Sequence, residues 1–293
     1  MIFGEIDSFF SLLDRFKSFF KNKDIEVHSE QPELLSTRLV RAFEAHGIHR
    51  NQIPRVIENG LTLCDVQSDE NFLIKIDDKI IQKSFSLLGI KRDWLEGASD
   101  QIYPTYDFYK NPYAFRKLLE NRLAETNHRL TGVLLSPQEK DNSNNAVLII
   151  QETVFSLESN SCHRYYICNN WNFSYWKSRV YLTACVSISW KNKLYVSGKT
   201  VSNKFINSIA WGLNIFNFGQ DGLYCINGES WHVEDMASSP EVFLKGIDPG
   251  YENYGVKSGL DNWLKLYNEG LMDYGVPDYE AKSRFINERK KFA

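Results

Sequence analysis

Apolar residues recur at helical spacing through the first third of the chain and form shorter runs after it. In the first twenty residues a phenylalanine-rich stripe repeats every three or four positions, which predicts an amphipathic helix; a polar linker completes residues 1–32. The polar face of this helix carries both signs of charge, so we expect it to pack on the protein or on a second copy rather than on a membrane. The pattern of residues 33–100 predicts several short helices that end near Gly97.

The pattern changes beyond residue 101, where short runs of valine, isoleucine and leucine predict strands. The strand candidates are Thr131–Ser136, Ala146–Phe155, His163–Cys168, Leu194–Ser197 and Gly222–Ile226. Helical patterns fall before, between and after them, at Pro112–Asn127, Tyr175–Ser189, Val201–Leu213, Glu241–Gly246 and Leu260–Met272. We therefore expect an α+β fold, in which an all-helical segment (33–100) precedes a mixed α/β domain (101–293) that serves ligand sensing or assembly.

Composition and charge narrow the class of protein. Among 293 residues, 43% are hydrophobic and 24% are charged, which is typical of a folded globular chain. A net charge of −3 argues against a protein that coats nucleic acid, so DNA binding would have to be local. Five cysteines without a CxxC pair, Glu5 and Asp7 near the start, and no apolar run long enough to cross a bilayer predict a cytoplasmic protein without a membrane role.

The run Leu88–Gly97 resembles the last helix and closing turn of lambda-repressor-like (Cro-type) helix-turn-helix domains. Arg38–Ala45 is similar to the first helix of that family, which ends in glycine and an aliphatic residue, and Arg50–Ile57 to the second. The 41 positions from Gly47 to Leu88 resemble the family's usual spacing. An alternative register makes Ile53–Gly60 the recognition helix, but it leaves too many residues before Leu88. The resemblance implies a bacterial, dimeric transcriptional regulator that binds double-stranded DNA.

The preferred register makes Leu61–Asn71 the recognition segment, which contains three carboxylates and no lysine or arginine. Carboxylates repel phosphate, and residues 33–96 carry nine basic and ten acidic side chains, whereas DNA-binding domains usually present a basic surface. The candidate DNA contacts are Arg38, Arg41, Arg50, Asn51, Arg55, Gln67 and Asn71. A second hypothesis is that this segment serves protein–protein interaction or dimerisation without DNA.

The densest cluster of aromatic and amide side chains lies at Asn169–Trp176. Rings beside amides suit a planar ligand, and they equally suit a loop packed over a core. If the C-terminal domain binds a small-molecule effector, we expect Asn170, Trp171, Tyr175 and Trp176 to contact it.

A third hypothesis is a metal-dependent enzyme. His232 and Glu234 alternate in sequence and, with His163 and Glu152, are the residue types of a metal site, although nothing fixes a third ligand. The tetrapeptide Ser197–Thr200 resembles the end of a phosphate-binding loop but lacks the first glycine, so we expect a turn there. The sequence therefore predicts no catalytic residue, metal or cofactor.

Overall fold

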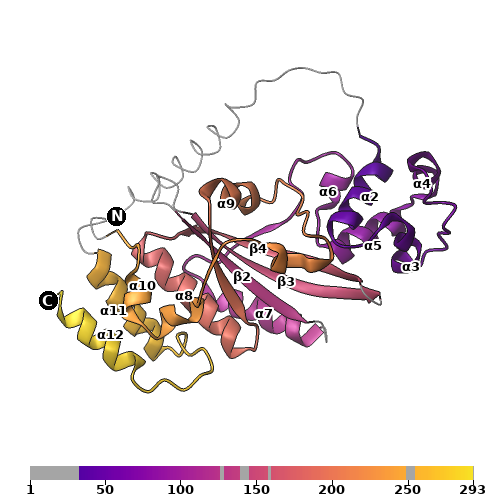
Figure 1. Ribbon diagram of the computed structural model, residues 1–293. Helices are drawn as coiled ribbons and strands as arrows, with labels where there is room; N and C mark the ends of the chain where they lie inside the picture. The colour runs from indigo at the N-terminus through magenta and orange to yellow at the C-terminus, as the bar shows by residue number, and fades with distance from the viewer. Residues whose placement is uncertain (1–32, 126–128, 139–144, 158–159, 249–254, 293) are drawn as a thin grey trace. The chain divides into compact units, whose positions relative to one another are not determined.

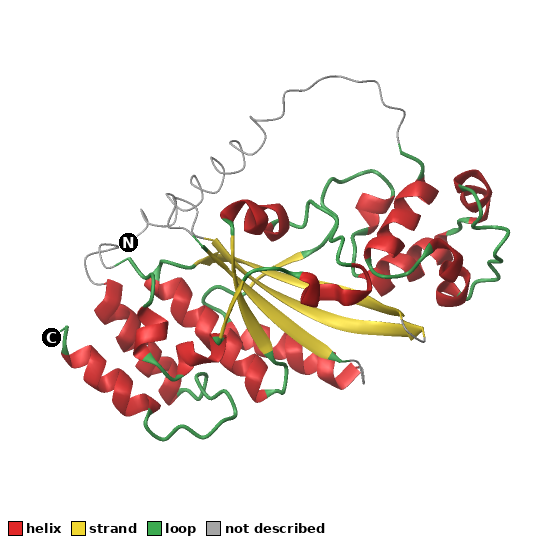
Figure 2. Cartoon of the chain, in the orientation of Figure 1, coloured by secondary structure: helices red, strands yellow, loops and turns green. Residues whose placement is uncertain are grey.

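A mixed β-sheet lies at the centre of the computed structural model, which describes residues 33–125, 129–138, 145–157, 160–248 and 255–292 (Figures 1 and 2). Within those residues the sheet has six strands in the order β1-β4-β3-β2-β5-β6. The strands are β1 (Thr105–Asp107), β2 (Leu130–Pro137), β3 (Asn145–Leu157), β4 (Asn160–Asn172), β5 (Val196–Val201) and β6 (Glu229–Trp231). β2, β3 and β4 form an antiparallel meander, β1 is parallel to β4, β5 is parallel to β2, and β6 is antiparallel to β5.

The strands predicted at Thr131–Ser136, Ala146–Phe155 and His163–Cys168 are confirmed as parts of β2, β3 and β4. The strand predicted at Gly222–Ile226 is wrong, because this segment belongs to the 3₁₀ helix η2 (Gly219–Cys225), in which Gly222 has a left-handed φ of 56°. The turn expected at Ser197–Thr200 is also wrong, because these residues lie within β5 and pair with β2. The mixed α/β class is confirmed.

One face of the sheet, here called the helix-covered face, packs against a layer of long helices (Figure 2). α7 (Pro112–Glu125), α8 (Trp176–Lys191) and α11 (Gly255–Asn268) form most of this layer, together with the 3₁₀ helix η3 (Val233–Ala237), α10 (Pro240–Leu244) and α12 (Ala281–Lys290). Twelve of the sixteen residues of α8 are buried, as expected for a helix that is enclosed on all sides. Trp263 of α11 stacks on Phe285 of α12 with ring centroids 3.5 Å apart.

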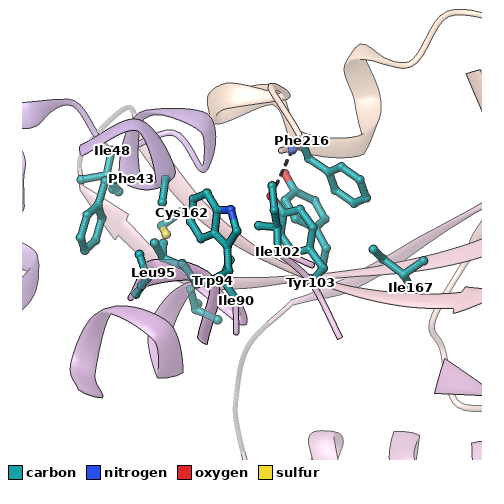
Figure 3. Close-up of a cluster of buried hydrophobic side chains, with 14 of the residues drawn as sticks. Phe43, Ile48, Ile90, Trp94, Leu95, Ile102, Tyr103, Cys162, Ile167 and Phe216 are labelled. Carbon is teal, nitrogen blue, oxygen red and sulfur yellow. Dashed lines mark hydrogen bonds between the residues drawn. The ribbon is translucent and has the colours of Figure 1, made fainter. Parts of the chain in front are cut away.

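The opposite face packs against α9 (Asn203–Ala210) and against residues 34–97, here called the helical segment. The helical segment contains α2 (Leu35–Ala45), the 3₁₀ helix η1 (Arg50–Gln52), α3 (Ile53–Ile57), α4 (Asp69–Lys75), α5 (Asp78–Leu88) and α6 (Arg92–Leu95). Side-chain caps from Ser68 and Asp77 fix the starts of α4 and α5. Phe43, Ile48 and Trp94 share one hydrophobic cluster with sheet residues such as Ile167 (Figure 3).

Residues Leu34–Ala293 form one compact unit, and the predicted amphipathic helix of residues 1–32 lies outside the described residues. Over the described ranges, no helix combines the length and the apolar character that crossing a bilayer requires.

Candidate functional site

The end of α2 is joined to the sheet by a buried chain of hydrogen bonds around His46. His46 Nε2 lies 2.9 Å from the Tyr103 hydroxyl, and that hydroxyl oxygen accepts the backbone N–H of Phe216 at 3.1 Å (Figure 3). His46 Nδ1 pairs with the carbonyl oxygen of His163, whose N–H donates in turn to the His46 carbonyl at 3.4 Å. A neutral imidazole protonated on Nδ1 fits these contacts, because Nδ1 donates to the His163 carbonyl and Nε2 accepts from the Tyr103 hydroxyl. Burial lowers the His46 pKa to about 4.

Gly47 allows the turn after α2 to rest directly on two other elements. Its φ is +91°, in the left-handed region that favours glycine. A Cβ at this position would collide with the Ser161 carbonyl oxygen of β4 and would lie 3.1 Å from the Gln220 backbone of η2. The helical segment, β4 and η2 therefore meet at one glycine.

Arg164 of β4 makes a second link between the sheet and the helical segment. Its Nε donates to the Leu87 carbonyl at 3.2 Å and its Nη2 donates to the Ser86 carbonyl, both in the last turn of α5. A cation is favoured at this negative end of the helix dipole. Arg164 Nη1 also lies 3.5 Å from a carboxylate oxygen of Glu152, which is fully buried and accepts the Tyr166 hydroxyl at 2.6 Å.

Polar side chains replace apolar ones at one end of the face that carries the helical segment. On three neighbouring strands, Thr131 is opposite Gln151 and Thr153 is opposite His163. η2 lies over this row: Gln151 Oε1 accepts the Leu223 N–H at 2.7 Å, and His163 Nε2 pairs with the Gln220 carbonyl at 2.9 Å. Burial lowers the His163 pKa, because the charged imidazolium is costly away from water.

These side chains line a cavity of about 720 Å³. The rest of its wall is formed by Arg129, Val154, Phe155, Ser156, Ser161, Asp221 and Tyr224. A second cavity of about 710 Å³ shares Arg129, Thr131 and Tyr224 with the first and continues along β5 and β6 past Ser197, Lys199 and Ser230. The two cavities together are called the polar groove below. Its size suits a small organic molecule.

Three of the four arginines predicted to contact DNA make contacts within the protein. Arg38 donates to the Trp94 carbonyl at 2.9 Å, and the guanidinium groups of Arg38 and Arg41 lie 6.0 and 5.7 Å from the centroid of the Trp94 ring. Arg50 donates to Asp69 at 2.5 Å and to the Val66 carbonyl at 3.3 Å. These contacts stabilise the helical segment itself.

The other predicted DNA contacts, Asn51, Arg55, Gln67 and Asn71, are exposed. Leu61–Asn71 does not form one helix, because Asp65 accepts the Thr62 N–H at 2.8 Å in a tight turn before α4 begins. Within residues 49–72, all of which the structure describes, the exposed Asp, Glu, Lys and Arg side chains are Arg55, Glu58 and Glu70. DNA binding therefore stays a prediction.

The aromatic residues predicted to bind a ligand belong largely to the core of the helix-covered face. Trp171 is fully buried and donates its indole N–H to the Cys168 carbonyl at 3.1 Å, and Trp176 is buried in the same cluster. Tyr175 is half-buried, and the exposed Asn170 amide donates to Asp107 at 2.7 Å. None of these four residues lines the polar groove.

The residues of the metal-enzyme hypothesis are not brought together. Glu152 faces the helix-covered side of the sheet with Tyr166, whereas His163 faces the polar groove on the other side. His232 Nδ1 lies 3.2 Å from Glu234. The described part of the chain holds no group of three or more His, Cys, Asp or Glu residues arranged to bind a metal ion.

The polar groove was not predicted from the sequence, although the sequence carries a signal for it. Thr131, Gln151 and Thr153 interrupt runs of valine, leucine and isoleucine at positions that share one face. Once the strand pairing is known, polar residues at neighbouring positions on a buried face of the sheet indicate a cavity with polar walls. No known family model, curated protein or solved structure matches this chain.

Proposed function

We propose that this chain is a ligand-responsive regulatory protein. A small polar molecule binds in the polar groove, and the helical segment carries the response to a macromolecular partner. The observation that supports this most strongly is a shared boundary: Ser161, His163 and Gln220 line the groove and also contact the turn at His46–Gly47.

The coupling follows from this shared boundary. A ligand that contacts Gln220 or His163 favours one position of η2 relative to β4, and the turn after α2 packs against both. If the helical segment has two positions relative to the sheet, binding shifts the equilibrium between them. The size of the shift equals the difference in the ligand's affinity for the two positions.

The resemblance to helix-turn-helix domains supports duplex DNA as the partner. Asn51 and Arg55 are exposed four residues apart across η1 and α3, so they share one face, and amide and guanidinium groups are the side chains that read base edges. The test is binding to a pool of random duplexes at low and physiological salt. We expect salt-sensitive binding that Arg55→Ala weakens and Lys117→Ala, an exposed residue of α7, leaves unchanged. Absence of binding at both salt concentrations would remove DNA from the proposal.

Exposed apolar side chains favour a second candidate partner, another copy of this chain. Leu63, Leu73 and Ile74 are 58%, 38% and 81% exposed. Asp65 lies 3.4 Å from Lys75, so the Leu63 turn and the end of α4 are neighbours. Sedimentation velocity should show a dimer that Ile74→Glu dissociates and Val276→Glu, an equally drastic change at a distant exposed site, leaves intact. A monomer at all concentrations would exclude this candidate.

A further inference from the structure

Basic side chains gather at the start of the two parallel strands in the polar groove. Gly132 pairs with Val196, and Arg129 and Lys193 each stand three positions earlier along the chain. Both line the second cavity, as do Lys199, Glu234 and His232. The second cavity is lined by these three cations and by one carboxylate, that of Glu234, and the first cavity adds Asp221. Basic groups therefore outnumber acidic groups in the groove.

Aromatic rings stand beside these cations. Tyr224 is 69% exposed, and its hydroxyl lies 3.4 Å from Arg129 Nη2. Tyr195 is 62% exposed and lines the same cavity. These two exposed rings offer flat surfaces for a planar ligand.

A buried polar group on the groove side of the sheet lacks a partner among the described residues. It is the hydroxyl of Thr131, a residue that lines both cavities. Buried polar groups in folded proteins are normally hydrogen-bonded. A bound molecule with acceptor oxygens would supply the partner that this hydroxyl lacks.

The free edge of β5 is closed to an added peptide strand. β6 already pairs with Gly198–Thr200, and before it the Val196 carbonyl accepts the Trp190 indole N–H at 3.3 Å. An extended peptide needs unpaired backbone groups along an edge. The groove therefore favours a small molecule on the face of the sheet.

We propose that the polar groove binds a small organic anion that carries a flat ring. Its acid group lies near Arg129 and Lys193, its ring packs on Tyr224, and its oxygens accept hydrogen bonds from Thr131. This inference rests on the proposed role of the groove as a ligand site and adds the class of ligand. Aromatic carboxylates and nucleoside monophosphates share this chemistry.

Isothermal titration calorimetry with two matched pairs of probes tests the proposed class of ligand. Adenosine monophosphate is compared with adenosine, and indole-3-acetate with indole-3-acetamide, so that each pair differs in the acid group. We expect at least one acid to bind about tenfold or more tightly than its neutral partner, equivalent to about 1.4 kcal/mol. The tighter acid identifies phosphate ester or carboxylate as the source. Equal affinities within both pairs, or no binding at all, would overturn the inference.

Two variants test whether the anion binds near Arg129. Arg129→Met should weaken the acid about tenfold and leave the neutral partner unchanged, because it removes a charge-assisted contact. Lys117→Met on α7 is the matched control, and circular dichroism shows that each variant is folded. Unchanged acid affinity in Arg129→Met would overturn the placement. If the anions fail to bind while duplex DNA or dimer formation is observed, the ligand class is wrong and the regulatory function stands.

Discussion

The two faces of the sheet differ in how completely they are filled. On the helix-covered face, apolar residues of β2, β3 and β4 meet α7, α8 and α11 in one continuous cluster. On the other face, the helical segment and α9 cover only part of the strands, and the rest carries hydroxyl, amide and imidazole groups around the polar groove. Close packing provides stability, whereas a cavity with polar walls costs stability and provides a place to bind. Each face holds a large buried apolar cluster that stabilises the fold, and we assign ligand binding to the second face, where the polar cavity lies.

The largest effect is expected on the helix-covered face. Trp263→Ala removes a fully buried indole that stacks on Phe285, and such truncations cost about 3–5 kcal/mol of unfolding free energy. Urea denaturation measures it. Tyr279→Ala, at a ring that is 91% exposed, is the control and should change stability little. A loss below about 1 kcal/mol for Trp263→Ala would contradict the assignment of stability to this face.

The buried imidazole of His46 should make stability depend on pH. Its pKa is about 4 in the folded protein, below the ordinary value of 6.5, so the unfolded chain binds a proton more readily. Stability is then full above pH 6.5 and falls as the pH drops from 6.5 to 4, by about 3 kcal/mol for this group. The pKa of His163 is lowered too, and it adds a loss of the same sign.

Urea midpoints measured from pH 7 to pH 4 test this dependence. Carboxylates with lowered pKa values, such as Asp69, act mainly below pH 4 and leave the upper window to histidine. His49→Gln, at an exposed site, should keep the slope. A flat profile between pH 6.5 and 4 would show that His46 titrates normally and is not enclosed at the junction.

A smaller effect is expected where the helical segment meets the groove. Gly47→Ala forces a left-handed φ on a residue with a Cβ and drives that Cβ against Ser161, at a cost of about 2 kcal/mol. Hydrogen exchange should also accelerate in α2. Gly60→Ala is the control, because Gly60 has a similar φ of +73° but open space around it. Its loss of stability measures the backbone strain alone, without a steric contact. Equal losses in the two variants would mean that the contact with β4 and η2 contributes nothing.

The smallest change in stability, and one of opposite sign, is expected inside the groove. Thr131→Val replaces a buried hydroxyl that has no partner among the described residues by a methyl group of similar shape. Relief of that burial should leave stability unchanged or raise it by up to about 1 kcal/mol. Calorimetry on the same variant should show weaker binding of the acid probe. A clear loss of stability would indicate that the hydroxyl already has a structural role.

The longer strands and helices were predictable from the sequence, because burial of one face or of all faces spaces the apolar residues in a regular pattern. The three-residue strands β1 and β6 were not predicted. β2, β3 and α8 follow runs whose apolar spacing is dictated by what covers them. The prediction at Gly222–Ile226 failed because the glycine that begins this apolar run has a left-handed φ and packs against Gln151, although the run otherwise resembles a strand. A one-dimensional pattern does not show such a tertiary contact.

Functional residues were harder to predict because their grouping depends on strand register. Thr131, Gln151 and His163 come from three strands and become neighbours only through pairing. The Asn169–Trp176 cluster shows the converse case. The centroid of its Phe173 ring lies 3.5 Å from the guanidinium carbon of Arg179, a buried arginine that donates to the Phe173 and Phe243 carbonyls and whose pKa burial lowers to about 9. Aromatic density alone does not distinguish a core from a ligand site.

Hydrogen–deuterium exchange with and without the tighter acid probe tests most directly whether the groove and the helical segment are coupled. We predict that binding changes protection in η2 and also in the His46–Ile48 turn and α2, while α11 and α12 stay unchanged. A change confined to the groove, with no effect in the turn or α2, would contradict the account.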